Sequence, residues 1–189
     1  MRGFRKAALL AIAGIAALLI PNVGNAAKMI GPNIVNNPGF EAAAGGPVTS
    51  CGSGGIAVGV PGWGGFNNGG GCTTTEVLPS TAPKGGAQMA HVVSANSDSG
   101  LVQCCYDIDV FEVRAAIKVN SGGAKVCVGV LGSPPCQLFY ATPGVWQRMQ
   151  TVSSDGSPGN PNEIVIYTVG SADFYVDLVS IREITLPGV

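Results

Sequence analysis

The residues most able to carry chemistry in this chain are six cysteines, all of which lie beyond residue 26. They are Cys51, Cys72, Cys104, Cys105, Cys127 and Cys136. The chain has a single histidine and no Cys-x-x-Cys pair, which argues against a zinc site. An even number of cysteines in an exported chain is typical of structural disulfides.

Spacing indicates two of the pairs and leaves the third open. A hairpin at Gly132-Ser133-Pro134-Pro135 would bring Cys127 and Cys136 face to face across two strands. Cys51 and Cys72 lie in two glycine-rich stretches that a disulfide between them could close. The adjacent cysteines at 104 and 105 can form a vicinal disulfide or exchange partners with the others.

No residue pattern indicates catalysis. His91 is the single histidine and no serine or cysteine motif accompanies it, so we expect a packed or surface side chain on a strand. Asp107 and Asp109 could in principle act on a glycosidic bond, but their spacing beside a strand is explained more simply by a solvated turn. We therefore predict that the protein is not an enzyme.

The first 26 residues are typical of an export signal. A basic segment from Arg2 to Lys6 precedes an apolar run over 7–20, and small residues allow cleavage after Ala26. The apolar run is shorter than the roughly 20 residues of a membrane span, and an uncleaved anchor is the alternative. We expect residues 27–189 to form one domain without a membrane span, located in the periplasm, at the cell surface or outside the cell.

Composition argues against a nucleic-acid partner. Beyond residue 26, seven Lys and Arg stand against eleven Asp and Glu, a balance that gives no long-range attraction for nucleic acid or anionic membranes. Charged residues make up only 11%, while glycine reaches 29 and proline 13. Many turns joining short strands explain this composition better than disorder does, because apolar residues recur throughout.

Short alternating segments predict an all-β fold. Apolar and polar residues alternate over 111–119, and valines repeat the pattern over 126–130. Further strands are expected at 138–141, 145–152, 164–169 and 174–181, separated by turn clusters. The glycine-rich stretch from Gly45 to Gly71 is expected to be a surface loop held by a disulfide. No segment shows a convincing helical period, so we expect a β-sandwich or barrel.

Two motifs near the ends of the expected domain carry a family resemblance. The first reads Asn-Ile-Val-Asn-Asn-Pro-Gly-Phe-Glu over 33–41 and is followed by Pro-Gly-Trp at 61–63, while the second reads Ala-Asp-Phe-Tyr-Val-Asp-Leu-Val-Ser-Ile over 172–181. They resemble the opening and closing strands of the jelly-roll carbohydrate-binding modules of families 4, 9 and 22, found beside cellulases and xylanases. Shorter matches between them extend the resemblance over about Asn33 to Ile181. It implies a β-sandwich jelly roll of two antiparallel sheets, here stapled by disulfides.

The resemblance implies a structural calcium ion. In these modules the Glu that ends the first motif and the first Asp of the last motif commonly ligate Ca²⁺ together with backbone carbonyls. Those positions are Glu41 and Asp177 here, with Leu178 where the family often has a second Asp. A hard cation prefers such oxygens and would tie the two chain ends together. The alternative is that Glu41 accepts backbone amides and Asp177 pairs with a Lys or Arg.

The resemblance also implies a sugar site. Sugar binding needs an aromatic face for the pyranose ring and polar groups for its hydroxyls. Gln103 stands where the family often has a polar sugar-contacting residue, and Tyr140 falls near the position of a stacking aromatic, with Phe139 as the competing choice. Tyr167 has a polar tip on an apolar strand and can face the same groove.

These features together predict an exported, non-catalytic protein that binds a polysaccharide or glycan. One alternative is a structural or adhesive cell-surface or matrix protein that uses the same fold without binding sugar. It would be favoured if Tyr140, Gln103 and Tyr167 did not converge on one groove. A small glycan-cleaving enzyme is the third possibility, and it requires two carboxylates that face each other across a cleft.

Overall fold

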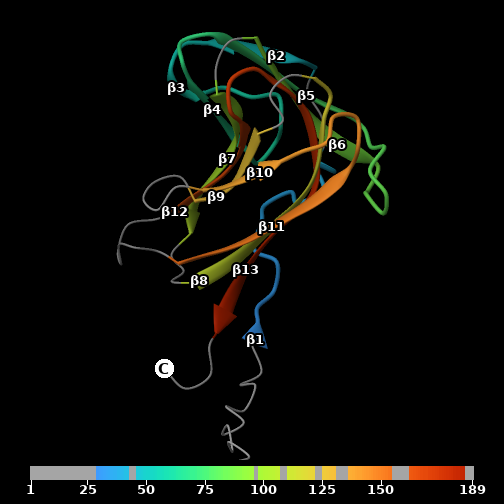
Figure 1. Ribbon diagram of the computed structural model, residues 1–189, viewed down its shortest axis with the longest axis vertical. Helices are drawn as coiled ribbons and strands as arrows, with labels where there is room; N and C mark the ends of the chain where they lie inside the picture. Colours follow the sequence, from blue (N-terminus) through green and yellow to red (C-terminus); the bar gives the residue numbers. More distant parts are fainter. Residues whose placement is uncertain are drawn as a thin grey trace, which may run out of the picture.

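The computed structural model describes residues 29–42, 46–95, 98–106, 110–121, 125–130, 136–154 and 162–185. The expected export signal, Asp107 and Asp109 lie outside these residues, and so does the side chain of Cys105. The described residues form β-strands arranged in two sheets that pack face to face (Figure 1). Among the described residues, no helix is long and apolar enough to cross a membrane.

The first sheet contains both the opening and the closing strand of the described chain. Its order is β11 (Gln147–Ser154), β8 (Val110–Val119), β13 (Ala172–Thr185), β6 (Gln88–Ser94), β5 (Cys72–Pro79) and β2 (Val48–Cys51), and β1 (Met29–Ile30) also pairs with β13. β1 and the end of β13 project together from the bottom of the sandwich in Figure 1. The chain ends therefore share one sheet.

The second sheet covers the inner face of the first. Its order is β10 (Gln137–Tyr140), β9 (Lys125–Val130), β12 (Asn162–Thr168), β7 (Asp98–Tyr106), β4 (Gly64–Asn68) and β3 (Gly54–Ile56). The strand pairs of both sheets are antiparallel. The predicted all-β sandwich of two antiparallel sheets is confirmed.

The core lies between the sheets and follows the period-2 pattern of the strands. Phe111, Ile117 and Phe174 point inward from β8 and β13, and Leu101 and Ile166 meet them from β7 and β12, all fully buried. Because successive side chains of a strand alternate between its faces, the residues between them face outward. The outer faces of the two sheets therefore carry the polar and aromatic groups considered below.

The glycine-rich stretch from Gly45 to Gly71 corrects the sequence prediction. We expected a surface loop, but the stretch contributes β2, β3 and β4, and so it adds strands to both sheets. Glycine hides the alternation that marks a strand, since it has no side chain to bury. Close packing explains its use here: Gly65 lies directly against the side chains of Ile56 and Val58, where a larger residue would overlap them.

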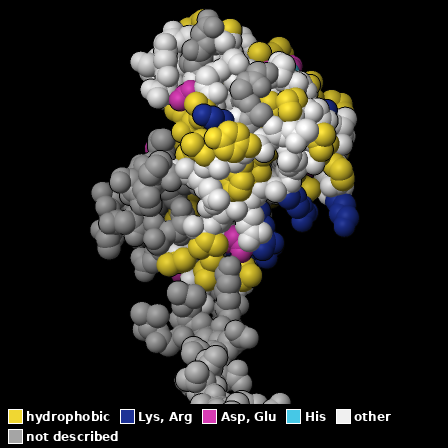
Figure 2. All heavy atoms as spheres, in the orientation of Figure 1, with side chains coloured by type: hydrophobic (Ala, Val, Ile, Leu, Met, Phe, Trp, Pro, Cys, Tyr) yellow, Lys and Arg dark blue, Asp and Glu magenta, His cyan; other side chains and the backbone are white. Residues whose placement is uncertain are grey.

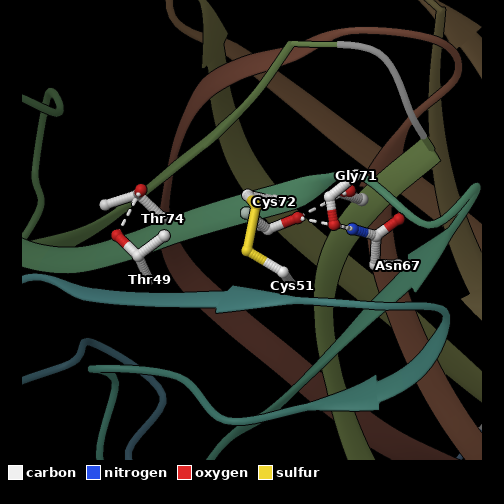
Figure 3. Close-up of a disulfide and its surroundings, with 8 residues drawn as sticks. Thr49, Cys51, Asn67, Gly71, Cys72 and Thr74 are labelled. Atoms are coloured by element: carbon white, nitrogen blue, oxygen red, sulfur yellow. Dashed lines mark hydrogen bonds between the residues drawn. A yellow bond between two sulfur atoms is a disulfide. The ribbon is translucent and has the colours of Figure 1, made fainter.

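Two disulfides are described, and both match the pairs that spacing indicated. Cys51 of β2 and Cys72 of β5 are direct cross-strand partners, with Cα atoms 4.0 Å apart. Beside them, the hydroxyls of Thr49 and Thr74 form a hydrogen bond of 2.8 Å across the same two strands (Figure 3). Cys127 of β9 is bonded to Cys136, the residue just before β10. The two disulfides indicate an oxidising, extracytoplasmic environment.

The register of β9 and β10 refines the second of these pairs. Leu138 lies directly opposite Cys127. Cys136 is therefore the diagonal neighbour of Cys127 on the same face of the sheet, and not the direct cross-strand partner of Cys127. Cys104 is also disulfide-bonded. The predicted alternative of a vicinal bond between Cys104 and Cys105 involves the Cys105 side chain, which lies outside the described residues.

Candidate functional site

The opening motif lies along β13, in the place that β6 leaves free. β6 pairs with β13 only as far as Val176, and beyond that point the segment after β1 takes over. The amide of Gly31 donates to the carbonyl of Glu183 at 2.9 Å, and the amide of Ile34 donates to Ile181 at 3.0 Å. The two motifs that suggested a family resemblance are therefore hydrogen-bonded to each other.

A bulge in β13 turns the closing motif toward the opening one. The pairing with β8 shifts register between Asp177 and Ser180, and Leu178 has a φ of 54°, a left-handed conformation that is rare for a branched residue. The bulge frees the amide of Val179, which donates to the carbonyl of Pro38 at 2.9 Å. The strained backbone thus places Asp177 beside the Asn37–Phe40 turn.

That turn in turn places Glu41. The amide of Phe40 donates to the carbonyl of Asn37 at 3.2 Å, while Asn37 donates from its side chain to the carbonyl of Pro61 at 2.8 Å. Phe40 is fully buried and its ring centroid lies 5.6 Å from that of Trp63. Glu41 follows directly and is directed at the segment between β5 and β6.

Glu41 and Asp177 converge on this segment, as the resemblance implied. Asp177 is fully buried and accepts hydrogen bonds from the Ser80 hydroxyl and from the Leu178 amide, each at 2.6 Å. Burial raises the pKa of Asp177, its two hydrogen bonds lower it, and the negative charge of Glu41 raises it. The Asp177 carboxylate is thus held in a place where its charge is unfavourable.

The surroundings of these carboxylates are rich in oxygen atoms and backbone amides. Glu41 accepts the backbone amide of Gln88 at 3.1 Å, while the side-chain amide of Gln88 donates to the carbonyls of Phe40 at 2.6 Å and Ala42 at 3.2 Å. Within the described part of the chain, no Lys or Arg forms an ion pair with Glu41 or Asp177. The alternative of a Lys or Arg partner for Asp177 therefore finds no support among these residues.

The donor set fits a hard cation, although its carboxylates are few. Two carboxylates and the Ser80 hydroxyl are oxygen donors of the kind that Ca²⁺ takes, and the carbonyls of Phe40 and Ala42, which accept the Gln88 amide, lie on either side of Glu41 in the chain. Among the described residues, no group of three or more His, Cys, Asp or Glu side chains forms a metal site. A calcium ion here would therefore depend on carbonyl and hydroxyl oxygens for most of its ligands.

Two glycines close the site and permit the approach of both carboxylates. A β-carbon at Gly85 would overlap the Asp177 carboxylate and the Ser80 hydroxyl, and one at Gly86 would overlap the Glu41 carboxylate. Neither glycine has the left-handed φ that a side chain resists. Their small size, rather than their backbone freedom, is what the site requires.

Gly85→Ala is expected to lower the free energy of unfolding by about 1–3 kcal/mol, the usual cost of inserting a methyl group into a packed site, because its β-carbon would overlap the buried Asp177 carboxylate. Gly55→Ala is the matched control, because a β-carbon there meets no atom within 4 Å. Urea unfolding followed by tryptophan fluorescence measures both. Equal stability of the two variants would contradict the close packing of Asp177 against Gly85.

The polar residue expected to contact sugar is buried instead. Gln103 is 6% exposed, and its side chain joins the opening segment to the Pro-Gly-Trp segment. Its oxygen accepts the amide of Asn36 at 2.8 Å and the Tyr106 hydroxyl, and its nitrogen donates to the carbonyls of Asn36 at 2.9 Å and Gly62 at 2.7 Å. Burial raises the pKa of Tyr106 to about 12. Gln103 is thus fully occupied in holding two loops together.

The three aromatic candidates separate onto two faces of the second sheet. Phe139 is the cross-strand partner of Val126 and packs against the core between the sheets. Tyr140 follows it on the outer face and is 74% exposed, with the Lys125 ammonium 5.9 Å from the ring centroid. Tyr167 is half-buried on the same outer face, where it packs with Val165 and the Cys127–Cys136 disulfide.

A row of apolar side chains crosses this outer face. Leu138, Cys127, Tyr167, Gly100 and Phe66 are successive cross-strand partners on β10, β9, β12, β7 and β4. A β-carbon at Gly100 would overlap Tyr167, and without one the rings of Phe66 and Tyr167 meet edge to face with centroids 5.0 Å apart. Figure 2 shows hydrophobic side chains gathered over β9 and β10.

Two members of this row, Phe66 and Leu138, were not singled out from the sequence. Phe66 is embedded in the glycine-rich stretch, where no alternation marked a strand. Leu138, 50% exposed, was placed on an expected strand without assigning it a face. Only the pairing of β4 with β7 and of β10 with β9 brings them into line with Tyr167.

His91 is a packed side chain on the outer face of the first sheet. Its ring nitrogens lie 2.9 Å from a Glu76 carboxylate oxygen and 3.2 Å from one of Asp173, and its ring stacks on Tyr175 with centroids 4.4 Å apart. No serine or cysteine is among these contacts. Of the packed and the surface side chain that the sequence left open for His91, the structure shows the packed one, on β6.

No protein-family model matches the chain, and no curated protein matches it either. Solved structures are similar in fold. A CBM22-1 xylan-binding domain from Paenibacillus barcinonensis Xyn10C is 17% identical, with a TM-score of 0.43, over 75% of this chain and 96% of that one. TmCBM61, solved in complex with β-1,4-galactotriose, is 14% identical, with a TM-score of 0.47, over 79% and 97%.

An adhesin domain has a similar chain course as well. The K1 cleaved adhesin domain of Lys-gingipain from Porphyromonas gingivalis is 13% identical, with a TM-score of 0.42, over 76% of this chain and 100% of that one. At these identities the likeness extends to the sandwich alone. The pairing of its strands makes the chain a β-sandwich of two antiparallel sheets, an architecture similar to that of these carbohydrate-binding modules.

Proposed function

We propose that this protein is an exported, non-catalytic glycan-binding domain that acts at the cell surface or outside the cell. The observation that carries the proposal is the apolar row across the outer face of the second sheet. A pyranose presents a face of C–H groups, which packs on exposed aromatic and apolar side chains. Tyr167 and Phe66 are half-buried members of the row, and the exposed Tyr140 lies two residues beyond Leu138 on β10, all on a rigid sheet where little order has to be gained on binding.

Polar groups beside this row supply hydrogen bonds to sugar hydroxyls. The Tyr140 and Tyr167 hydroxyls can donate and accept, and the Lys125 ammonium donates from the same face. Burial, and then the negative charge of Asp98, raises the pKa of Tyr167, which keeps its hydroxyl protonated as a donor. On a surface of this kind the apolar side chains can pack on the C–H face of a sugar ring, while the polar groups hydrogen-bond the hydroxyls at the edge of the ring.

We also propose that a structural calcium ion binds between Glu41 and Asp177. Its support is the convergence of two carboxylates without a Lys or Arg partner in the described part of the chain, beside the Ser80 hydroxyl and two carbonyls. When bound, the ion would neutralise the repulsion between the carboxylates. Glu41 and Asp177 would then tie the opening segment to β13.

Binding of glycans by the oxidised protein tests the main proposal. A glycan array identifies a ligand, and calorimetry then compares variants. Tyr140→Ala is expected to weaken binding roughly tenfold, in the range for loss of one aromatic contact. Tyr140→Phe retains the ring and loses only the hydroxyl, so its affinity should lie between those of Tyr140→Ala and the wild type. Binding that survives both Tyr140→Ala and Tyr167→Ala unchanged would refute the assignment of the outer face.

A structural or adhesive role without sugar binding is the second candidate. The observation in its favour is that Gln103 does not join Tyr140 and Tyr167 on their face, because its side chain is buried between two loops. If the folded, oxidised protein bound neither soluble nor insoluble glycans, that result would favour this role. Its apolar outer face would then be a surface for protein contacts.

A further inference from the structure

A cavity of about 580 Å³ opens on the outer face of the first sheet, away from the aromatic row. Strands β8, β11 and β13 form its floor, and the Pro38–Glu41 turn forms one wall. Its volume lies within the range of small-molecule sites, roughly 300–1,000 Å³. Neither the aromatic row nor the pair of carboxylates explains this cavity.

All the arginines that the chain has beyond residue 26 line this one cavity. They are Arg114, Arg148 and Arg182, one from each of three adjacent strands. Arg148 pairs with Ala116, next to Arg114 along β8, and Arg182 pairs with Glu112 on the other side of β8. Figure 2 shows Lys and Arg side chains gathered on the flank below β11. The chain as a whole has an excess of acidic residues, whereas three arginines gather at this cavity.

The positive charge is only partly balanced by neighbouring groups. Arg114 forms an ion pair with the buried carboxylate of Glu112. Glu41 reaches the opposite wall, where its oxygen accepts the Gln88 amide. Within the described part of the chain, Arg148 and Arg182 form no ion pair. The cavity therefore carries a net positive charge.

Donor groups at the cavity lack acceptors. The Nε–H groups of Arg114 and Arg182 are buried and have no hydrogen-bond acceptor among the described residues. These two groups have no exposed surface, so a ligand would instead meet the outer ends of the guanidinium groups, as at Arg114, whose side chain is 43% exposed. Gln150 and Ser180 flank Arg114 on the neighbouring strands and add uncharged polar groups.

We propose that this cavity binds the carboxylate or sulfate group of an acidic glycan. The planar guanidinium fork matches the two oxygens of a carboxylate, or two of a sulfate, in a bidentate pair. Gln150 and Ser180 would hydrogen-bond the hydroxyls of the same sugar. The inference rests on the proposed glycan-binding function and adds its substrate class, a glycan that carries negative charge. The charged group would bind on the outer face of the first sheet, not on the outer face of the second sheet where the aromatic row lies.

Calorimetry on the oxidised protein with paired probes tests the proposal. Trigalacturonate is compared with its methyl ester, and a sulfated galactan oligosaccharide with its desulfated form, which separates the two sources of charge. At least one charged form should bind about tenfold more tightly than its neutral partner. Arg148→Gln and Arg182→Gln should each remove most of that preference and leave the neutral form unaffected. Neither variant removes Arg114, which is the ion-pair partner of Glu112.

Lys125→Gln is the matched control, since it removes the same charge from the second sheet. An equal loss in this variant, equal affinity for charged and neutral probes, or tighter binding of an oligonucleotide of equal charge would each overturn the proposal. Neutral glycans that bind only through Tyr140 would keep the proposed function while this inference fails. Arginine-dependent binding of galacturonate by a protein that ignores all neutral glycans would support the cavity and refute the aromatic site.

Discussion

Replacing Phe40 with alanine is expected to lower the free energy of unfolding by about 3–5 kcal/mol, the usual cost of truncating a fully buried phenylalanine. Phe40 has no exposed surface and packs on Trp63 in the core between the sheets. It also anchors the turn that directs Glu41 toward Asp177. The variant should therefore lose calcium binding along with stability.

Urea unfolding followed by tryptophan fluorescence measures the loss, because Trp63 contacts the ring that is removed. Phe40→Leu keeps most of the apolar volume and should cost less than about 1.5 kcal/mol. Leu138→Ala truncates a side chain that is 50% exposed and should change stability by less than about 1 kcal/mol. If Phe40→Ala were no more destabilising than Leu138→Ala, the opening motif would not be anchored in the core.

The elements predicted best from the sequence are those with a regular alternation of apolar residues. The pattern over 111–119 became β8, and that over 174–181 became the centre of β13. Both strands lie in the middle of a sheet with one face on the core, where the pleat forces alternation on the sequence. The Cys127–Cys136 pair could also be predicted locally, because the turn residues Gly132 to Pro135 between the two cysteines indicate a hairpin.

Local patterns could not predict what depends on close contact between distant strands. The Gly45–Gly71 stretch forms strands because its glycines fit against neighbours such as Ile56 and Val58, which the sequence does not reveal. The same limit hid the cavity of Arg114, Arg148 and Arg182. These residues are far apart in the chain and meet only because β13 inserts between β6 and β8 and β11 adds at the edge.

Site residues carried over by resemblance separate into two groups for a physical reason. Glu41 and Asp177 converge because the motifs that contain them are hydrogen-bonded to each other. Gln103 and Phe139 point inward, since each occupies the inward phase of its strand, while Tyr140 and Tyr167 occupy the outward phase. A shift of one residue along a strand exchanges these faces, so a position near a family motif does not settle exposure.

Calcium is expected to raise the unfolding temperature of the protein, and chelation to lower it. A ligand that binds only the native state stabilises it by about 2.7 kcal/mol at a concentration of 100 times Kd. For a domain of this size that corresponds to a shift of about 5–10 °C. Calorimetric unfolding in calcium, in magnesium and in a chelator measures the effect. Glu41→Gln and Asp177→Asn should each abolish the calcium shift.

The same variants distinguish an ion site from a hydrogen-bonded carboxylate. Burial and the charge of Glu41 raise the pKa of Asp177 in the folded state, so without calcium its contribution to stability is lost as pH rises through that pKa. In the chelator at neutral pH, Asp177→Asn should therefore be at least as stable as the wild type, because it removes a buried charge. Calcium should reverse that order, since only the wild type gains from the ion. An Asp177→Asn variant that is less stable than the wild type in chelator, with no calcium shift in either protein, would mean that the Ser80 and Leu178 hydrogen bonds alone account for Asp177.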